Sequence, residues 1–520
     1  MIFTSFEFIG FIAIVLLGYF CIPKKVRWIW LTGASVYFYL CASVKYSVFL
    51  LFSAASVYLF GLYIAKCDKA LEQCELPKEE KKAFRKKNDK KKYFAIAVTL
   101  VVNLGILGFL KYADFAIESV SKIVRVFAPA FEVSSLSLVL PLGISFYTFM
   151  AAGYAIDVYR GISPAEKNPI KLLLFLSYFP HIMQGPIDRY ENLAPQLFEG
   201  HAFDFDRVAR GLRRMLWGFF QKLIIADRLA MLVNQVFDRS ESYSGAYLLL
   251  AVFVYAIQIY ADFAGYMDIA LGASQVMGIY PEENFDSPYL SASVPEFWRR
   301  WHMSLGSWFR DYLFYPVMRS GAIKKLSKKL KKKYSAAIAG TVSTCIALAV
   351  VWFTTGLWHG AAWHYIAWGV YYGILIILST ITKPYTDKIK IDREKAWYKI
   401  FSIVKTFLLV LFGYILFRAN NMTHAFIVIS RIFTKFPVSN NAAGQALGLD
   451  RADLIVAAIA IIILIIVDII RYRGKKPADF VTALPLPIRW TLVYIAIIAV
   501  LVFGIYGPGY DAASFIYFQF

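Results

Sequence analysis

The chain has 520 residues, of which 59% are apolar and only 18% are charged. Soluble domains are roughly 45–50% apolar and about 25% charged, and the mean hydropathy of this chain is +0.55. These values exclude a soluble enzyme, a secreted disulfide scaffold and a disordered tail protein. They predict a polytopic membrane protein.

The formal net charge is +21. In a soluble protein such an excess would suggest nucleic-acid binding, but here Lys and Arg cluster between apolar runs, as in loops held on the cytoplasmic side. We therefore expect anionic lipid headgroups and no nucleic acid as partners. The five cysteines include no CxxC pair, so no disulfide framework and no metal site is expected.

Apolar runs close to the length of a membrane span recur along the whole chain, which predicts an all-α transmembrane protein with about 11–12 spans. The first run lacks a basic segment before it and a cleavage site after it, so we expect it to be a retained helix. In chain order the runs are 6–22, 28–44, 46–65, 93–112, 136–158, 215–237, 246–268, 335–354, 364–381, 401–418, 452–470 and 489–507.

Basic segments follow alternate runs, at 24–27, 66–92, 324–333 and 471–476. Placing all four in the cytoplasm predicts a multi-pass protein of the cell (plasma or inner) membrane, with both termini extracytoplasmic. The segment 66–92 is expected to be a Lys-rich cytoplasmic loop.

Two stretches break this alternation. Residues 170–190 are apolar but contain Pro180, Gly185 and Pro186, which predicts a broken or re-entrant helix. Residues 285–318 combine Trp and Arg and predict amphipathic helices at the cytoplasmic interface. With no internal repeat, residues 1–520 are expected to form a single domain.

Walker A, GxGxxG, HExxH and GxSxG motifs are absent from the sequence, so candidate chemistry rests on ionisable groups near membrane depth. His359 lies in GLWHGAAWHY (356–365), where Gly and Ala permit close packing or close approach of a substrate. Histidine is well suited to proton transfer near neutral pH. The alternative is a core histidine that is hydrogen-bonded between helices.

His302 lies in EFWRRWHMSLGSWFRDYLF (296–314) and, at helical spacing, shares a face with Trp298. It could meet a ligand that enters from the cytoplasm, or it could be a packing residue. Asp262 and Asp268 lie within or at the end of an apolar run, so each carboxylate needs a partner. For Asp262 either a structural ion pair or a role at the site stays open.

Several strings together resemble the membrane-bound O-acyltransferase family, and most closely its bacterial polysaccharide branch, typified by the membrane subunit of alginate O-acetylation. The resemblance is concentrated in residues 140–372 and extends to the closing SFIYFQF. The strings, in order, are LPLGISFYTFMAAGYAIDVYRG, FPHIMQGPI, YADFAGYMDIALG, NFDSPYLSASVPEFWRRWHMSLGSWFRDYLFYP and GLWHGAAWHYIAWG.

The resemblance implies a membrane enzyme with a central tunnel. It implies that His359 is catalytic and that His302, also catalytic, lines the cytoplasmic part of the path. The predicted substrate-binding residues are Trp298, Arg299, Asn284 and Asp262. No cofactor is expected to be bound, and acetyl-coenzyme A is the expected donor substrate.

The implied function is transfer of an acetyl group from a cytoplasmic thioester to hydroxyl groups of an extracytoplasmic polysaccharide, directly or through an extracellular serine-dependent partner transferase. Within the family, a D-alanyl transferase of teichoic acid that uses a carrier-protein thioester is the alternative. Outside it, a transporter or flippase would use the histidines as proton relays and predicts paired broken helices. A purely structural scaffold predicts that both histidines tolerate replacement.

Overall fold

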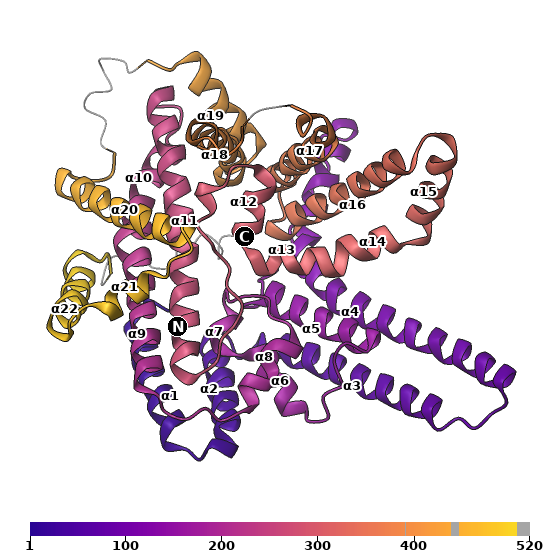
Figure 1. The fold of residues 1–520 in the computed structure, drawn as a ribbon. Helices are drawn as coiled ribbons and strands as arrows, with labels where there is room; N and C mark the ends of the chain where they lie inside the picture. Colours follow the sequence, from indigo (N-terminus) through magenta and orange to yellow (C-terminus); the bar gives the residue numbers. More distant parts are fainter. Residues whose placement is uncertain (390–391, 438–446, 507–520) are drawn as a thin grey trace. The chain divides into compact units, whose positions relative to one another are not determined.

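The computed structural model describes residues 1–389, 392–437 and 447–506, and within these ranges the chain forms helices and no strand (Figure 1). An isolated antiparallel bridge joins Phe285 to Trp301. The expected all-α class is therefore confirmed. The closing SFIYFQF string lies outside the described residues.

The chain folds into two compact units. Unit 1 comprises Met1–Leu212 and Ala270–Glu282, and unit 2 comprises Arg213–Ile269 and the described residues from Glu283 onward. One long helix, α11 (Gly245–Met277), contributes residues to each unit. That both units act as a single domain stays a prediction.

Unit 1 contains the first eight helices and the beginning of the ninth. They are α1 (Phe6–Cys21), α2 (Arg27–Ala42), α3 (Ser47–Glu72), α4 (Lys78–Phe127), α5 (Ile144–Arg160), α6 (Pro169–Ser177), α7 (Phe179–Ile182), α8 (Tyr190–Phe198) and α9 (Phe205–Phe219).

Unit 2 contains the rest of α9, most of α11 and all later helices. A π-helical turn (Phe220–Ala226) joins α9 to α10 (Asp227–Asp238), and a second one (Arg310–Phe314) joins α13 to α14. The other helices are α12 (Val294–Arg300), α13 (Met303–Phe309), α14 (Tyr315–Arg319), α15 (Gly321–Lys333), α16 (Ala336–His359), α17 (Trp363–Thr386), α18 (Ala396–Arg418), α19 (Met422–Thr434), α20 (Arg451–Tyr472), α21 (Pro477–Ala483) and α22 (Leu486–Phe503).

Eight helices of the described chain are long and apolar enough to cross a membrane: α3, α4, α11, α16, α17, α18, α20 and α22. The multi-pass character is thus confirmed. The other four predicted runs do not meet these criteria, although each contains helix, and the run 136–158 is helical only from Ile144. The helices α1 and α2 have 16 residues each and α5 has 17, while the run 215–237 is divided by the π-helical turn.

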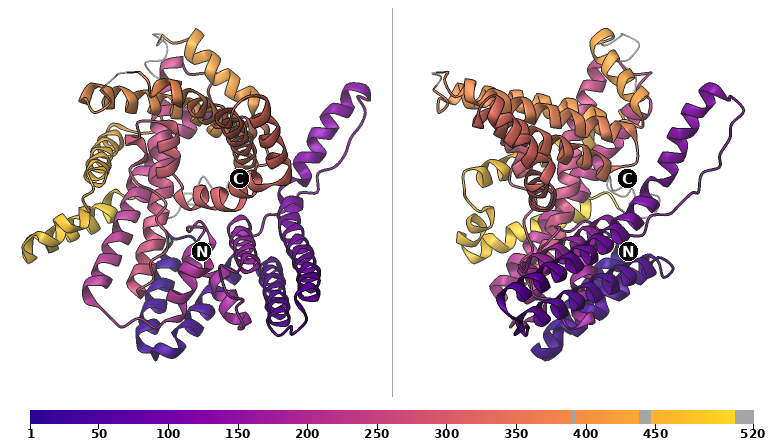
Figure 2. Two further views of the ribbon diagram at one scale, coloured as in Figure 1. Left: turned by 45° about the vertical axis from the view of Figure 1, so that its right-hand side comes forward. Right: turned by 90° about the vertical axis from the view of Figure 1, so that its right-hand side faces the viewer.

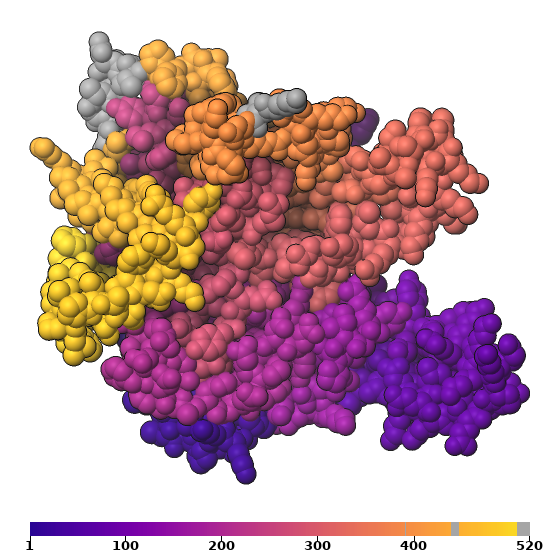
Figure 3. Space-filling view, in the orientation of Figure 1, coloured from indigo at the N-terminus to yellow at the C-terminus, as the bar shows by residue number. Residues whose placement is uncertain are grey.

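The helix α11 is the most deeply packed of these eight, because 83% of its apolar window is buried against 6–50% in the others. The helix α22 is the least buried of the eight, at 6%. Both α20 and α22 lie at the surface (Figure 3), where α20 exposes Ile455, Ile459 and Ile462. Exposed isoleucines on a span-length helix are typical of a surface that faces lipid.

The basic segment 66–92 is mostly helical, and the expectation of a loop is wrong there. It forms the end of α3, a short turn and the beginning of α4, whose 50 residues continue without a break into the apolar run (Figures 1 and 2). Lys, Glu and Arg are good helix formers, so charge alone does not end a helix. Asn88 also ties the pair together, because its amide donates to the carbonyl of Cys67 at 2.8 Å.

The segment 170–190 is broken, as its sequence predicts. Asn168 caps the N-terminus of α6, because its side chain accepts a hydrogen bond from the backbone amide of Ile170 at 2.9 Å. The next helix, α7, is only one turn long. The carbonyl oxygen of Ile182 lies so close to Gly143 that a Cβ there would be 1.9 Å away, and Gly143 also has φ +66°. Only glycine fits at this position.

Candidate functional site

The two predicted catalytic histidines both belong to unit 2. His359 is the last residue of α16, which turns through Gly360–Ala362 into α17. The two helices approach closely at Gly356 and Gly369, because a Cβ on Gly356 would lie 2.6 Å from the carbonyl oxygen of Tyr365. The small residues around His359 therefore serve close helix packing, one of the two roles left open for them.

Aromatic rings hold the imidazole of His359, whose side chain is almost fully buried. Its ring centroid lies 4.7 Å from that of Trp368, 4.9 Å from Trp358 and 5.3 Å from Phe417, each in an edge-to-face arrangement. Because α16 ends here, the carbonyl end of the helix dipole favours positive charge on this ring. A base that gains a proton during a reaction is suited to that position.

His302 precedes α13 and has a left-handed backbone, with φ +48° and ψ +54°. This conformation is uncommon for residues other than glycine and is found preferentially at functional sites. It aims the imidazole at Asn284, with 3.4 Å between Nδ1 and the Asn284 Oδ1. The imidazole ring is perpendicular to the ring of Phe263, at a centroid distance of 4.9 Å.

Burial lowers the pKa of His302 from its ordinary value to about 3. The imidazole is therefore neutral at physiological pH and can accept or donate a hydrogen bond. Trp358 packs against both histidines, at 5.8 Å from the ring of His302 and 4.9 Å from that of His359. The two predicted catalytic residues therefore contact the same indole ring.

Asn284 orients the turn that carries His302, since its Oδ1 also accepts from the backbone amide of Ser304 at 2.9 Å. We expect Asn284→Ala to lower the rate of the reaction at this site on the order of 10-fold to 100-fold, because misplacement of a reacting group by about 1 Å has such effects. Loss of a buried acceptor should also cost about 1–3 kcal/mol of stability. Initial rates and thermal unfolding of the purified protein test both effects. The exposed Asn420→Ala variant is the control, and an unchanged rate in Asn284→Ala would contradict the role.

The other predicted substrate-binding residues are placed differently. Trp298 contacts Trp368 at 5.4 Å and so lies one ring away from His359. Arg299 is exposed, and its side chain forms no ion pair or hydrogen bond with any residue that the structure describes. Neither observation tests binding, so both assignments stay predictions.

Asp262 lies on α11 and belongs to a buried ion cluster. Lys222, in the π-helical turn, places Nζ 2.7 Å from Asp262 Oδ1 and 2.6 Å from Asp227 Oδ1, and all three side chains are at most 5% exposed. The structural ion pair considered for Asp262 is thus present. Its sequence neighbour Phe263 contacts the ring of His302, so one turn of α11 contributes to both the ion cluster and the candidate site.

Asp268 is also paired, as predicted for a carboxylate at this depth. Its Oδ1 accepts from Arg214 Nε at 2.8 Å, and its Oδ2 accepts from Gln221 at 2.9 Å. His364 lies with Nδ1 3.1 Å from the carbonyl oxygen of Leu416, a buried backbone contact.

Sequence reasoning missed Lys222, Trp358, Trp368 and Phe417. A single lysine inside the apolar run 215–237 is itself a signal, because it requires a carboxylate partner at membrane depth. The string GLWHGAAWHYIAWG contains both tryptophans. Only the hairpin of α16 and α17 reveals that they meet at His359, and the sequence gives no signal for Phe417 on α18.

Unit 1 contains a separate cluster of buried polar side chains in the broken segment 170–190. His181 Nδ1 lies 3.3 Å from Asp188 Oδ2, and the Asp188 Oδ1 accepts from the backbone amide of Glu282 at 3.0 Å. Gln184 is also buried, and in the described chain its amide has no hydrogen-bond partner. Burial lowers the pKa of His181 to about 3 and raises the pKa of Asp188 well above its ordinary value.

These shifts predict a pH dependence of stability. Between pH 6.5 and about 3 the unfolded chain binds a proton at His181 that the folded chain does not, so the contribution of His181 to stability falls as the pH falls through this range, whereas the raised pKa of Asp188 acts in the opposite direction. Each fully linked proton changes the free energy of unfolding by about 1.4 kcal/mol per pH unit. We therefore expect His181→Gln to lose stability less steeply than wild type on acidification. Thermal unfolding from pH 7 to pH 4 measures both slopes, and parallel curves would contradict the prediction.

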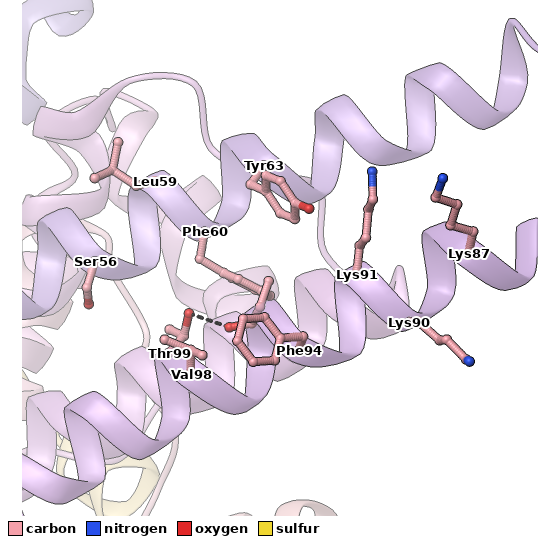
Figure 4. Close-up of a pocket in the computed structure, with 11 residues that line it drawn as sticks. Ser56, Leu59, Phe60, Tyr63, Lys87, Lys90, Lys91, Phe94, Val98 and Thr99 are labelled. Carbon is pink, nitrogen blue, oxygen red and sulfur yellow. Dashed lines mark hydrogen bonds between the residues drawn. The ribbon is translucent and has the colours of Figure 1, made fainter. Parts of the chain in front are cut away.

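A groove of about 740 Å³ lies in unit 1 between α3 and α4 (Figure 4). Apolar side chains such as Tyr63 and Phe94 line it, and Lys87 and Lys91 extend between the two helices at one end. It contains none of the residues predicted for the site. An open apolar groove with a basic end suits lipid contact rather than enclosed chemistry.

The geometry in unit 2 supports proton transfer in a dry environment. A buried neutral imidazole and a second one at a helix C-terminus share an aromatic enclosure, and exclusion of water favours transfer to a substrate over hydrolysis. The described residues contain no group of three or more His, Cys, Asp or Glu side chains that could hold a metal ion.

Comparison with known proteins agrees with this chemistry. The model of the membrane-bound O-acyltransferase family matches residues 163–418, which include both histidines. A probable alginate O-acetylase of Pseudomonas putida is 34% identical, over 81% of this chain and 83% of its own length.

Two further relatives have other names. A peptidoglycan O-acetyltransferase of Helicobacter pylori is 28% identical, over 82% of this chain and 78% of its own length. A teichoic acid D-alanyltransferase of Bacillus subtilis is 32% identical, over 55% of this chain and 71% of its own length.

Proposed function

The chain belongs to the membrane-bound O-acyltransferase family, and from this premise we propose that it transfers an acetyl group from acetyl-coenzyme A to hydroxyl groups of an extracytoplasmic polysaccharide. Similarity to a probable alginate O-acetylase over most of both chains supports an acetyl donor and a glycan acceptor. The observation that carries the proposal is the pair of buried imidazoles, His302 and His359, which both pack against Trp358.

His359 acts as the general base. It takes the proton of the acceptor hydroxyl while the oxygen attacks the thioester carbonyl carbon, and the electron pair of the C=O bond moves to the carbonyl oxygen. When the intermediate collapses, the C–S bond breaks and the thiolate leaves with the proton from His359. The ester and the free thiol are the products. The helix end at His359 stabilises the imidazolium between these two steps.

His302 binds and orients rather than exchanging the main proton. Its neutral imidazole, fixed by Asn284 and Phe263, offers a hydrogen bond to the donor or acceptor as the two meet. Arg299 is exposed on α12, and the lysines of α15 form an exposed basic helix. These cations attract the phosphates of coenzyme A and raise its local concentration.

The donor reaches the site from the cytoplasm and the acceptor from outside, through the tunnel that the family resemblance implies. A separate extracellular transferase with a serine nucleophile can complete the modification of the glycan. A D-alanyl transferase that uses a carrier-protein thioester is the second candidate, supported by the 32% identity to the Bacillus subtilis protein.

The test supplies the purified protein in nanodiscs with radiolabelled acetyl-coenzyme A and, separately, with a D-alanyl carrier-protein thioester. We expect release of free coenzyme A and labelling of added oligosaccharide with acetyl-coenzyme A alone. Turnover only with the carrier-protein thioester would overturn the acetyl donor and favour the D-alanyl reading. Turnover with neither, in the presence of acceptor glycan, would overturn the proposed function.

A further inference from the structure

The aromatic rings that surround His359 and Trp368 include two indoles whose N–H groups need an acceptor. Trp298 Nε1 and Trp368 Nε1 are buried, and neither has a hydrogen-bond partner in the described chain. Native proteins satisfy nearly all buried polar groups, so each such donor requires an explanation. Ligands that arrive during the reaction supply acceptors that the resting protein lacks.

No oxygen atom of the described chain accepts a hydrogen bond from Trp368 Nε1. Rings enclose its indole at centroid distances between 4.7 and 6.4 Å. An N–H over an aromatic face is a weak interaction and does not replace an acceptor. The rings that enclose Trp368 are those of Trp298, Trp352, His359, Tyr372 and Phe417.

A trapped water is a poor match for this place. A buried water needs two to four polar partners, and its own protons need acceptors. Trp298 and Trp368 are both donors, and their rings lie 5.4 Å apart. Two donors in an apolar enclosure match an oxygen atom that has lone pairs and no proton, such as a carbonyl oxygen or an oxyanion.

We propose that the indole N–H groups of Trp368 and Trp298 bind the carbonyl oxygen of the acyl thioester and stabilise the oxyanion that forms on it. This inference rests on the proposed function, since it deepens the step in which His359 deprotonates the acceptor. The ring of Trp368 lies 4.7 Å from that of His359, so the base and the proposed oxyanion donor are direct neighbours. Negative charge grows on the carbonyl oxygen as the hydroxyl oxygen attacks, and an N–H donor held in a fixed position can stabilise it.

The enclosure also keeps the donors rigid. The indole of Trp368 cannot turn away without displacing several packed rings, and its side chain is 2% exposed. Donors that need no reorganisation in a water-excluded site stabilise a developing charge more than water does. Trp368 and Trp298 thus take part in the chemistry, whereas the other rings of the enclosure contribute packing.

The experiment compares Trp368→Phe with Trp352→Phe. Trp352 belongs to the same cluster, at 4.8 Å from Trp298, but its nitrogen is not among the buried atoms of the described chain that lack a partner. Both variants lose similar volume, so they separate the N–H from the packing. We expect Trp368→Phe to lower kcat about 10²–10³-fold with little change in KM for acetyl-coenzyme A, and Trp352→Phe to change kcat by less than about threefold.

Each outcome decides between the two claims. If wild type transfers acetyl groups and Trp368→Phe matches Trp352→Phe in kcat, the oxyanion assignment is overturned while the proposed function stands. If wild type cleaves neither thioester donor, the proposed function fails and the assignment fails with it. Should Trp368→Phe unfold, the benzothienyl isostere of tryptophan at position 368 keeps the ring shape and removes only the N–H. Full activity of that variant would overturn the assignment.

Discussion

Replacing His359 by alanine is expected to lower the rate of acyl transfer by a factor of about 10²–10⁴, which is the usual contribution of a general base. The imidazole sits at the end of α16, where the helix end favours the proton it must hold. The enclosure should survive the change, because Trp358 and Trp368 also pack on other rings. Binding of the donor is expected to be nearly unchanged.

The measurement is thioester cleavage in nanodiscs, with thermal unfolding as the check on folding. His424→Ala is the matched control, because His424 lies in the same unit on α19 and places Nε2 3.1 Å from the Ser240 hydroxyl, away from the aromatic enclosure. Cleavage at the wild-type rate in a folded His359→Ala protein would remove His359 from the chemistry. Equal losses in both variants would point to a structural effect.

Replacing Lys222 by methionine is expected to cause the largest loss of stability. It leaves the carboxylates of Asp227 and Asp262 buried together after removal of the cation that lies 2.6 and 2.7 Å from them. Breaking a buried ion cluster by removing one partner typically costs about 3–5 kcal/mol. Lys222 is 1% exposed, so water cannot replace the ammonium group.

The control is a variant in which the whole cluster is neutral: Lys222→Met with Asp227→Asn and Asp262→Asn. Neutral, well-packed replacements of a buried ion cluster are often tolerated, so this triple variant should regain most of the thermal stability. Thermal unfolding in one detergent compares the three proteins. A stable Lys222→Met protein would contradict the role of the cluster, and so would a triple variant less stable than the single one.

Local patterns predict the elements and the histidines, but not the partners of those histidines. His302 and Asn284 are 18 residues apart, and their contact depends on a left-handed turn at His302 that no spacing rule predicts. Likewise, Lys222 and Asp262 meet across two helices, so each carboxylate could be expected to have a partner without that partner being identified. Tertiary packing decides such pairs.

Span prediction from length has a similar limit. In the sequence, α1 and the run 215–237 both appear as apolar segments. Only the structure shows that α1 is one helix of 16 residues and that the run 215–237 is divided by a π-helical turn. Conversely, the charge of 66–92 suggested a loop, although helix formers dominate it. Hydropathy measures how well a segment tolerates lipid, whereas helix length follows backbone propensity and capping.

The unbroken length of α4 has a consequence for how far its charge reaches. Fifty residues at 1.5 Å each make a rod of about 75 Å, more than twice the roughly 30 Å of a hydrocarbon core. The basic first turns, Lys78 to Lys92, account for about 22 Å of that rod. This exceeds the Debye length of about 8 Å in physiological salt, so in an upright rod the outermost lysines lie beyond the screened field of the headgroups. These lysines can then interact with solutes in the aqueous phase. Because they lie on a helix, their positions are more fixed than those of lysines in a flexible loop.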